Sequence, residues 1–225
     1  FLGIKHVLAV QSGTAALHLA LKAVNIKPGD NVIIPNYSCV ASISSTTQSS
    51  AKPVVVEVEN DTLGLDFSLI KNAIKKYNPK ALQLVHVYGF PARDSLKIKK
   101  YCNKKKITLI EDCSGALGAE INNRKVGTLG DISIFSVRSD KMIGVGEGGV
   151  ICTNKSGLFN KIQLLAARNA PHRSDNDHFW KKYYHLGEGY NYLMPHLLGS
   201  VARAQIERFK KELLYKKIKV GNFYR

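Results

Sequence analysis

Short apolar segments alternate with amphipathic segments through the first half of this chain, and this alternation constrains the fold more than any other feature. The apolar segments predict β-strands at 6–10, 31–35, 53–58, 81–88 and 107–111, and the segments between them predict helices ending near 24, 50, 77 and 104. Strands joined by helices are typical of βαβ units, which form a mostly parallel sheet covered on both faces. We therefore predict one domain of the α/β class, a three-layer α/β/α sandwich.

The second half of the chain follows a different pattern. A hairpin is predicted at 119–127 with Asn122-Asn123 at its turn, followed by strands at 131–135 and 150–153 and a helix at 157–168. Pro195 begins a last helix whose apolar positions mark one face: Leu197, Leu198, Val201, Ile206, Phe209 and Leu213. The polar segment between these two helices is predicted to be a loop that orders on assembly or binding; it holds Pro171, His172, His178, Trp180 and His185, without metal-site spacing.

Residues just after the predicted strands are the candidates for a binding site, because ligands of parallel sheets bind at the carboxyl ends of the strands. These segments are 11–14, 36–39, 88–89, 112–115 and 136–141. In the first of them, Ser12, Gly13 and Thr14 open a helix, so backbone N–H groups, a hydroxyl and the helix dipole can bind an anion. An isolated motif of this kind more often only caps the helix through Ser12 or Thr14.

Asp112 and Lys141 are the two charged residues of interest at these strand ends. Asp112 follows a very apolar strand, so its carboxylate needs a partner: a lysine, a helix N-terminus or a protonated ring nitrogen. Capping of the residues after it is an equally good interpretation. Lys141 precedes apolar residues and a glycine-rich turn, surroundings that can desolvate an amine and make it nucleophilic. A single lysine after a strand is usually a solvated charge, so this segment alone identifies nothing.

Several segments together resemble the sugar-nucleotide aminotransferases of the DegT family, which are fold-type-I pyridoxal phosphate enzymes. In chain order they are VLAVQSGTAALHLAL, VIIPNYSCVAS, VHVYGFPA, LIEDCSGALGA, KVGTLGDISIFS, Lys141 with GEGG, and GYNYLMP with the helix after it. They extend from Val7 to about Arg208, and their common order and spacing make the combined pattern specific.

The resemblance implies a role for each matching residue. Lys141, five residues after Ser136, matches the lysine that carries pyridoxal 5′-phosphate as a Schiff base. Asp112 matches the aspartate that keeps the pyridine nitrogen protonated, so that the ring can accept electrons from the substrate carbanion. The phosphate-binding positions of the family are matched by Gly13, Thr14 and Ser136. Asn191 matches an asparagine that reaches the phosphate from the neighbouring subunit, which implies a homodimer.

Three positions depart from the family pattern. Cys39 stands where relatives place an aromatic residue stacked on the cofactor ring, and Tyr37 nearby should point the other way if the segment is extended. Gly115 stands where relatives have Gln, His or Glu near the ring hydroxyl. Cys39 and Gly115 are therefore candidate contacts of the cofactor ring, with side chains that differ from those of relatives. Leu193 replaces a common arginine, and residues 138–140 have no assigned role.

The implied function is a pyridoxal phosphate-dependent aminotransferase. It would move an amino group, with glutamate as the family's usual donor, to the keto-sugar of a nucleoside diphosphate sugar, in amino-deoxysugar and polysaccharide biosynthesis. A dehydratase on the same scaffold has histidine in place of the lysine, so Lys141 argues against it. A non-catalytic remnant that binds a phosphorylated ligand at Gly13 and Thr14 stays an alternative, because Cys39 and Gly115 change the ring contacts.

Composition adds expectations about partners and location. The formal net charge of +16 suits an anionic substrate and cofactor; the basic residues are scattered and form no nucleic-acid-binding motif, so no nucleic-acid partner is expected. The four cysteines form no CxxC pair, which is typical of reduced thiols in a cytoplasmic protein and gives no metal site. No apolar segment approaches the roughly 18 residues of a membrane span.

The two ends of the chain suggest a longer parent protein. The sequence starts at Phe1 without a methionine and stops at Arg225, shortly after a lysine-rich amphipathic helix. We expect residues 1–225 to be the large, cofactor-binding domain, with an N-terminal segment and a C-terminal small domain outside it. The 225 residues alone are expected to be inactive and poorly soluble.

Overall fold

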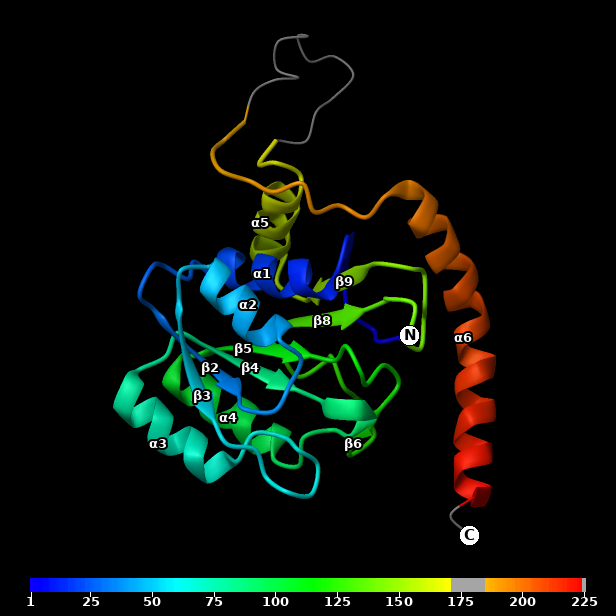
Figure 1. Ribbon diagram of the computed structural model, residues 1–225, viewed down its shortest axis with the longest axis horizontal. Helices are drawn as coiled ribbons and strands as arrows, with labels where there is room; N and C mark the ends of the chain where they lie inside the picture. The colour runs from blue at the N-terminus through cyan, green and yellow to red at the C-terminus, as the bar shows by residue number, and fades with distance from the viewer. Residues whose placement is uncertain (171–184, 224–225) are drawn as a thin grey trace.

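A seven-stranded sheet forms the centre of the computed structural model, which describes residues 1–170 and 185–223 (Figure 1). The strands stand in the order β1-β9-β8-β5-β4-β2-β3. Their bounds are β1 (His6–Val10), β2 (Asn31–Pro35), β3 (Lys52–Val56), β4 (Ala81–Val85), β5 (Thr108–Asp112), β8 (Ile132–Ser136) and β9 (Gly149–Thr153). Pairing is parallel from β3 across to β8, whereas β9 is antiparallel to both of its neighbours, β8 and β1. The predicted mostly parallel sheet is confirmed.

Helices cover both faces of this sheet. One face carries α1 (Gly13–Ala23), α2 (Ala41–Gln48) and α5 (Ser156–Ala166), and the other carries α3 (Phe67–Tyr77) and α4 (Ser95–Lys105) (Figure 1). Alternate strand residues serve the two layers, as the pleat of a strand requires. Val32 and Ile34 belong to the core under α1, whereas Ile33 between them belongs to the core under α3 and α4. The α/β/α sandwich follows from apolar runs that are buried on both faces.

Two local features differ from or add to the predicted elements. The strand predicted at 81–88 ends at Val85, and the chain continues into a 3₁₀ turn, η1 (Val87–Gly89). The reason is Tyr88, whose φ of +52° is incompatible with a strand. The predicted hairpin is confirmed as β6 (Glu120–Ile121) and β7 (Arg124–Lys125), and both residues at its tip, Asn122 and Asn123, have positive φ.

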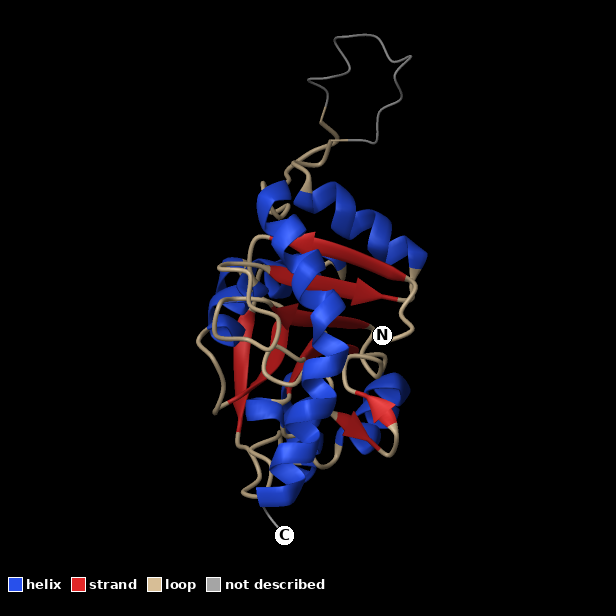
Figure 2. Cartoon of the chain, turned by 90° about the vertical axis from the view of Figure 1, so that its right-hand side faces the viewer, coloured by secondary structure: helices blue, strands red, loops and turns tan. Residues whose placement is uncertain are grey.

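The last helix, α6 (His196–Phe223), begins directly after Pro195, as predicted. It runs along the side of the molecule toward which the parallel strands point (Figures 1 and 2). Its predicted apolar face is only partly buried. Phe209 packs against Val137, Ile143 and Val145, while Leu197, Val201 and Ile206 are exposed. In the part of the chain that the structure describes, Ala202 and Leu213 of this helix are partly buried beside Phe209.

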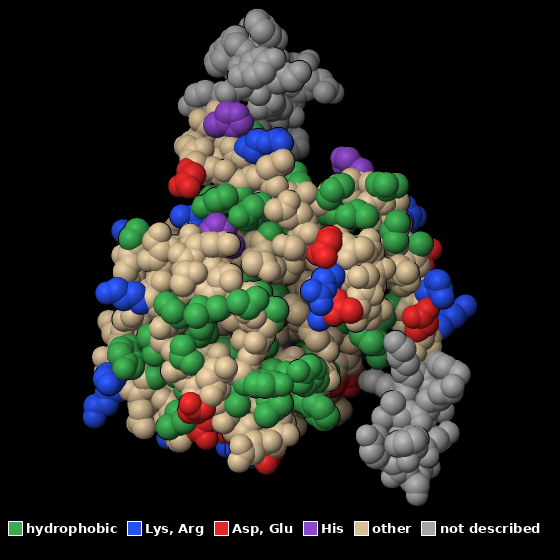
Figure 3. All heavy atoms as spheres, viewed as in Figure 1, with side chains coloured by type: hydrophobic (Ala, Val, Ile, Leu, Met, Phe, Trp, Pro, Cys, Tyr) green, Lys and Arg blue, Asp and Glu red, His purple; other side chains and the backbone are tan. Residues whose placement is uncertain are grey.

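The remaining expectations concern the long loop, the cysteines and the surface. Residues 171–184 of the predicted loop, with Pro171, His172, His178 and Trp180, lie outside the described residues; at its end, His185 Nδ1 lies 2.8 Å from the Arg168 carbonyl oxygen. All four cysteines are free, as expected. Among the described helices, none combines the length and apolarity needed to cross a membrane. On the face shown in Figure 3, Lys and Arg side chains are interspersed with Asp and Glu rather than gathered into one basic patch.

Candidate active site

A cleft of about 700 Å³ lies at the carboxyl ends of four parallel strands. Its walls are the segments that follow β2, β4, β5 and β8, since these strands all point to one edge of the sheet. Five of the predicted site residues line it: Cys39, Asp112, Gly115, Ser136 and Lys141. The sheet therefore brings together residues that are separated by up to a hundred positions in the chain.

Asp112, the last residue of β5, lies at the bottom of this cleft and is only 5% exposed. Burial raises the pKa of its carboxyl, and hydrogen bonding from Ser114 together with the charge of Lys141 offsets this only in part. The Ser114 N–H donates to Asp112 Oδ1 at 2.9 Å. The capping contact considered from the sequence is thus present, yet the ionised carboxylate remains disfavoured. A cation in the cleft would stabilise it.

Lys141 projects from the segment between β8 and β9, and its side chain is 29% exposed. Backbone hydrogen bonds hold this segment: Lys141 N–H donates to the Arg138 carbonyl and Val145 N–H to the Val137 carbonyl, both at 2.9 Å. Val137, Ile143 and Val145 are buried against α6. The lysine thus stands on an apolar base, as expected, and lines the cleft.

An ion-pair group that the sequence did not predict surrounds the amine. Arg138 donates to Asp140 from Nε at 2.7 Å and from Nη2 at 2.9 Å, and Lys141 Nζ lies 3.3 Å from Asp140 Oδ2. The hydrogen bond from Arg138 holds the pKa of Asp140 well below its usual range. Residues 138–140 therefore place a lasting negative charge beside the lysine. Charge alternation in the sequence (RSDK) was the available signal.

The N-terminus of α1 lies behind Ser136. Ser12 caps the helix by accepting a hydrogen bond from Ala15 N–H at 3.0 Å, so the capping interpretation is correct for Ser12. A Cβ at Gly13 would lie 3.2 Å from Ser136 Cβ and 3.5 Å from Ser114 Oγ, which shows how closely the helix start approaches the cleft wall. The first N–H groups of a helix have no partner within it, so those of Gly13 and Thr14 are available to an anion. Neither Gly13 nor Thr14 lines the cleft itself.

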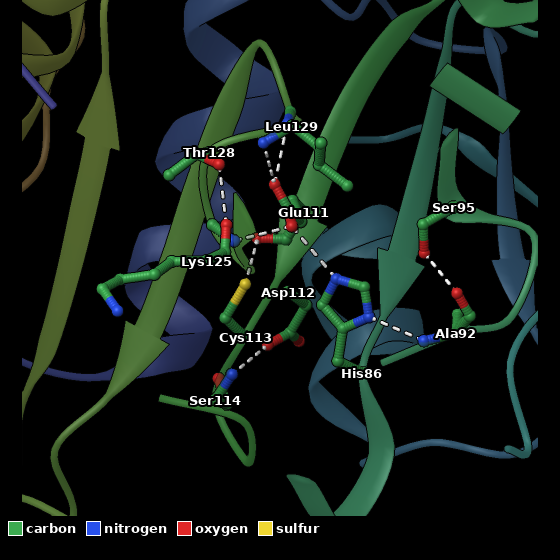
Figure 4. A network of polar contacts seen from close by, with 12 residues as sticks. His86, Ala92, Ser95, Glu111, Asp112, Cys113, Ser114, Lys125, Thr128 and Leu129 are labelled. Carbon is green, nitrogen blue, oxygen red and sulfur yellow. Dashed lines mark hydrogen bonds and ion pairs between the residues drawn. The ribbon is translucent and has the colours of Figure 1, made fainter. Parts of the chain in front are cut away.

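A buried histidine–glutamate pair supports the inner wall and was also missed from the sequence (Figure 4). Ala92 N–H donates to His86 Nδ1 at 3.0 Å, so Nε2 carries the proton that His86 shares with Glu111 Oε1, also at 3.0 Å. Glu111 also accepts hydrogen bonds from three backbone N–H groups, those of Gly127, Leu129 and Gly130. The pair joins the segment that follows β4 to β5 and fixes the position of His86 in the cleft wall.

Three potential metal ligands meet in this network, where His86, Glu111 and Cys113 place ligand atoms within 4.8 Å of one another. Both ring nitrogens of His86 and both oxygens of Glu111 already take part in hydrogen bonds. Burial raises the pKa of the Cys113 thiol well above its usual value, which disfavours the thiolate that a metal needs. We therefore assign this cluster to the hydrogen-bond network.

Cys39 and Gly115, the two positions at the cleft that depart from the family pattern, lie on the turns that form its wall. Tyr37 was expected to point away from the cleft if its segment were extended, but residues 36–38 form a bend, and Tyr37 and Cys39 both line the cleft. A Cβ at Gly115 would lie 3.4 Å from the backbone nitrogen of Tyr88 and 3.6 Å from the His86 carbonyl oxygen. The absence of a side chain at 115 thus lets the turn after β4 pack directly on the turn after β5.

Asn191 and Leu193 do not line the cleft. Asn191 is exposed and forms an isolated β-bridge with Ala167, and Leu193 forms one with Val10. Among the described residues, Asn191 is not part of the cleft of its own chain.

Comparisons with known proteins agree with this architecture. The family model described as DegT/DnrJ/EryC1/StrS aminotransferase family matches residues 1–225. GDP-perosamine synthase of Vibrio cholerae is 37% identical over 100% of this chain and 59% of its own length. The UDP-N-acetyl-3-dehydro-alpha-D-glucosamine 3-aminotransferase of Acidithiobacillus ferrooxidans is 35% identical over 90% of this chain and 52% of its own.

Solved structures show the same fold. NtdA from Bacillus subtilis with bound cofactor PMP superposes with a TM-score of 0.80 at 28% identity, over 93% of this chain and 45% of that one. The expected fold of the fold-type-I pyridoxal phosphate transferases is confirmed. The chain spans 59% or less of the length of the two curated relatives named here. It belongs to the DegT/DnrJ/EryC1/StrS aminotransferase family.

Proposed function

We propose that this chain is the large, cofactor-binding domain of a pyridoxal phosphate-dependent aminotransferase that aminates the keto-sugar of a nucleoside diphosphate sugar. The observation that carries the proposal is the cleft that holds Lys141 and Asp112 together in a chain of this family. Relatives named for GDP- and UDP-linked sugars support the substrate class. Glutamate as donor, a cytoplasmic location and a role in amino-deoxysugar and polysaccharide biosynthesis complete the proposal.

The residues of the cleft suit pyridoxal 5′-phosphate. Its aldehyde needs an amine, and Lys141 lines the cleft. Its ring nitrogen, when protonated, needs an anion, and the buried Asp112 carboxylate is disfavoured as an ion without a cationic partner. Its phosphate needs N–H groups and a hydroxyl, and the start of α1 lies against Ser136. These three partners stand along one edge of the sheet, as the three functional groups of the cofactor require.

Each residue then has a defined task. The bound cofactor supplies a ring that accepts electrons when the donor loses its α-proton. Asp112 keeps the ring nitrogen protonated by its charge. Lys141 Nζ would hold the cofactor through its aldehyde, and as a general base it would accept the α-proton of the donor. Gly13, Thr14 and Ser136 hold the phosphate, and Cys39 and Gly115 lie beside the ring.

Asn191 supports a homodimer in this proposal. Asn191 is exposed and does not line the cleft of its own chain, as expected of a residue that serves a neighbouring copy. In the dimer, Asn191 of one subunit would donate to the phosphate held by Gly13, Thr14 and Ser136 of the other.

Borohydride trapping tests the assignment of Lys141. Protein containing these 225 residues is incubated with pyridoxal 5′-phosphate, reduced, digested and mapped by mass spectrometry. The label is expected on the peptide with Lys141, is expected to be lost in Lys141→Ala, and is expected to persist in Lys125→Ala, whose amine pairs with Glu120 outside the cleft. A label that persists in Lys141→Ala overturns the assignment. An absorbance spectrum that does not respond to glutamate or any other amino donor would favour a non-catalytic remnant.

A further inference from the structure

Two tyrosines form the outer part of the cleft. Tyr37 follows β2 and Tyr88 follows β4, and their hydroxyl oxygens are 3.1 Å apart. The rings meet edge to face, with centroids 6.4 Å apart and an interplanar angle of 66°. This hydrogen bond raises the pKa of Tyr37. Both residues line the same cleft as Lys141 and Asp112.

Tyr88 adopts a backbone conformation that is costly for a large side chain. Its φ and ψ are +52° and +24°, in the left-handed region that aromatic residues rarely adopt. The neighbouring Gly89 also has positive φ, and Gly115 lies directly beneath the Tyr88 backbone nitrogen. Two glycines thus permit a strained turn that carries a tyrosine. Such strain is concentrated at functional sites.

The Tyr88 ring, which this strained turn carries, adds little to the stability of the fold. Tyr88 is 74% exposed and Tyr37 is 44% exposed, so burial of the rings does not offset the strain. The exposed fraction of the side chains rises along the cleft from Asp112 through Lys141 to Tyr88. A long substrate whose reacting end lies beside Lys141 could therefore extend its other end toward the more exposed tyrosines.

We propose that Tyr37 and Tyr88 bind the nucleobase of the nucleotide-sugar substrate, with the Tyr88 ring stacked on the base. This inference rests on the proposed function, which places the keto-sugar at Lys141. A nucleoside diphosphate sugar carries its flat aromatic ring at the end opposite the sugar. Stacking on an aromatic side chain is tolerant of base identity and strengthens binding substantially. The hydroxyl contact with Tyr37 fixes the angle of the Tyr88 ring.

Calorimetric titration with guanosine diphosphate and with uridine diphosphate tests the proposal on the cofactor-loaded protein. Tyr88→Ala is expected to raise the dissociation constant of either nucleotide by about fivefold or more. Tyr88→Phe keeps the ring and is expected to bind within about twofold of the unaltered protein. The matched control is Tyr77→Ala, an exposed tyrosine whose carbonyl bonds to Asn31 at the opposite end of β2, and it is expected to leave binding unchanged.

Thermal unfolding of Tyr88→Gly separates a ligand contact from a structural role. Glycine relieves the left-handed strain, so the Tm is expected to stay the same or to rise by up to about 4 °C while nucleotide binding is lost. A lower Tm in Tyr88→Gly means that the ring supports the fold and overturns the proposal. Unaltered nucleotide binding in Tyr88→Ala overturns it as well, and a changed oligomeric state of that variant in light scattering would then assign the ring to a contact between copies.

The outcomes separate this inference from the proposed function. Suppose that the cofactor attaches covalently at Lys141, and that Tyr88→Ala and the unaltered protein bind the nucleotide equally well. This result leaves the aminotransferase proposal intact and removes the nucleobase proposal. Loss of nucleotide binding in Tyr88→Ala, without any borohydride label at Lys141, removes the aminotransferase proposal and keeps the nucleobase site. Failure of the unaltered protein to bind either nucleotide removes the nucleobase site.

Discussion

Glu111 and Asp112 are adjacent in β5, project to opposite faces of the sheet, and have pKa values shifted in opposite directions. For both, burial is the largest influence and raises the pKa. At Glu111, hydrogen bonds from His86 and from backbone N–H groups outweigh burial, so its pKa is lowered. At Asp112 the hydrogen bonds do not outweigh burial, so its pKa is raised. The first carboxylate is therefore satisfied by the protein itself, and the second is left for a ligand.

Asp112→Asn is expected to separate stability from activity. The amide oxygen can still accept the Ser114 hydrogen bond, and the disfavoured charge is gone, so the Tm without cofactor should not fall. The rate of the half-reaction with the amino donor should fall by about a hundredfold or more, as on removal of one preorganised electrostatic partner. Single-turnover absorbance measurements give that rate.

Asp131→Asn is the matched control for that variant. Lys155 and Lys99 lie 2.8 and 3.2 Å from Asp131 Oδ1, and the pKa of Asp131 is lowered because these contacts and the Leu109 N–H bond outweigh its burial. Its replacement should lower the Tm and spare the half-reaction. If Asp112→Asn also lowers the Tm and spares the half-reaction, the carboxylate is structural and its proposed role is wrong.

Glu111→Gln should destabilise the fold by about 3–5 kcal/mol, because it removes one partner of a fully buried charged network and turns an NH₂ group toward N–H donors.

The lowered pKa of Glu111 predicts the pH dependence of this effect. Its contribution is complete above the ordinary value of 4.5 and is lost as the pH falls through the lower folded-state pKa. Urea unfolding at pH 7 and stepwise below pH 5 should show a flatter acid limb for the variant. Glu207→Gln, exposed on α6, is the control; equal stability of both variants would contradict this.

At the scale of elements, β9 determines where α1 begins. Gly149, the first residue of β9, packs beneath the residues that start the helix. A Cβ at this position would lie 2.3 Å from the Ser12 carbonyl oxygen and 2.7 Å from the Gly13 nitrogen, distances that only a backbone shift can relieve. The last glycine of GEGG therefore supports the proposed phosphate site from below, far from it in sequence.

Gly149→Ala should displace the start of α1 and cost about 1–3 kcal/mol of folding free energy, as overpacking does. It should also weaken binding of pyridoxal 5′-phosphate, because the N–H groups of Gly13 and Thr14 move with the helix. Urea unfolding and a titration with the cofactor measure the two effects. Gly157→Ala, in the first turn of α5 with no atom within 4 Å of the added Cβ, should be neutral or stabilising. Unchanged cofactor affinity in Gly149→Ala would separate α1 from the phosphate site.

Periodicity and flanking residues were enough to predict the helices and strands. The contacts between residues of different strands depend on the register of the sheet. β1, β2 and α3 have the predicted bounds, because each is one uninterrupted apolar or amphipathic pattern between turn residues. β4 is shorter than predicted because Tyr88 has a left-handed backbone conformation. No feature of the local sequence indicates that conformation. The His86–Glu111 pair depends on β4 and β5 being neighbours with Leu84 opposite Glu111, which no local pattern specifies. Asp112, in contrast, was found because it directly follows a predicted strand, and Lys141 was assigned because its segment resembles that of the family.

At the scale of the whole molecule, the cleft joins segments that are held together only through the sheet. The turns after β2, β4, β5 and β8 line the cleft, and the start of α1 lies against Ser136 in its wall. These segments come from distant parts of the chain, and they meet only in the folded state. A ligand that contacts several of them binds the folded state and not the unfolded chain. Such a ligand raises stability by RT ln(1 + [L]/Kd), about 2.7 kcal/mol at a hundredfold excess over Kd.

Pyridoxal 5′-phosphate at that excess should therefore raise the Tm by roughly 5–10 °C for a domain of this size. Pyridoxal without phosphate should raise it less, because the start of α1 is then not engaged, and inorganic phosphate should give only a small rise. In Lys141→Ala the phosphate-dependent part of the shift should remain, since Gly13, Thr14 and Ser136 are untouched, while the covalent part is lost. Differential scanning fluorimetry with the three ligands measures these shifts. Equal shifts for pyridoxal and its phosphate would show that the helix start does not bind the phosphate, and the absence of any shift would show that the cleft does not bind this cofactor.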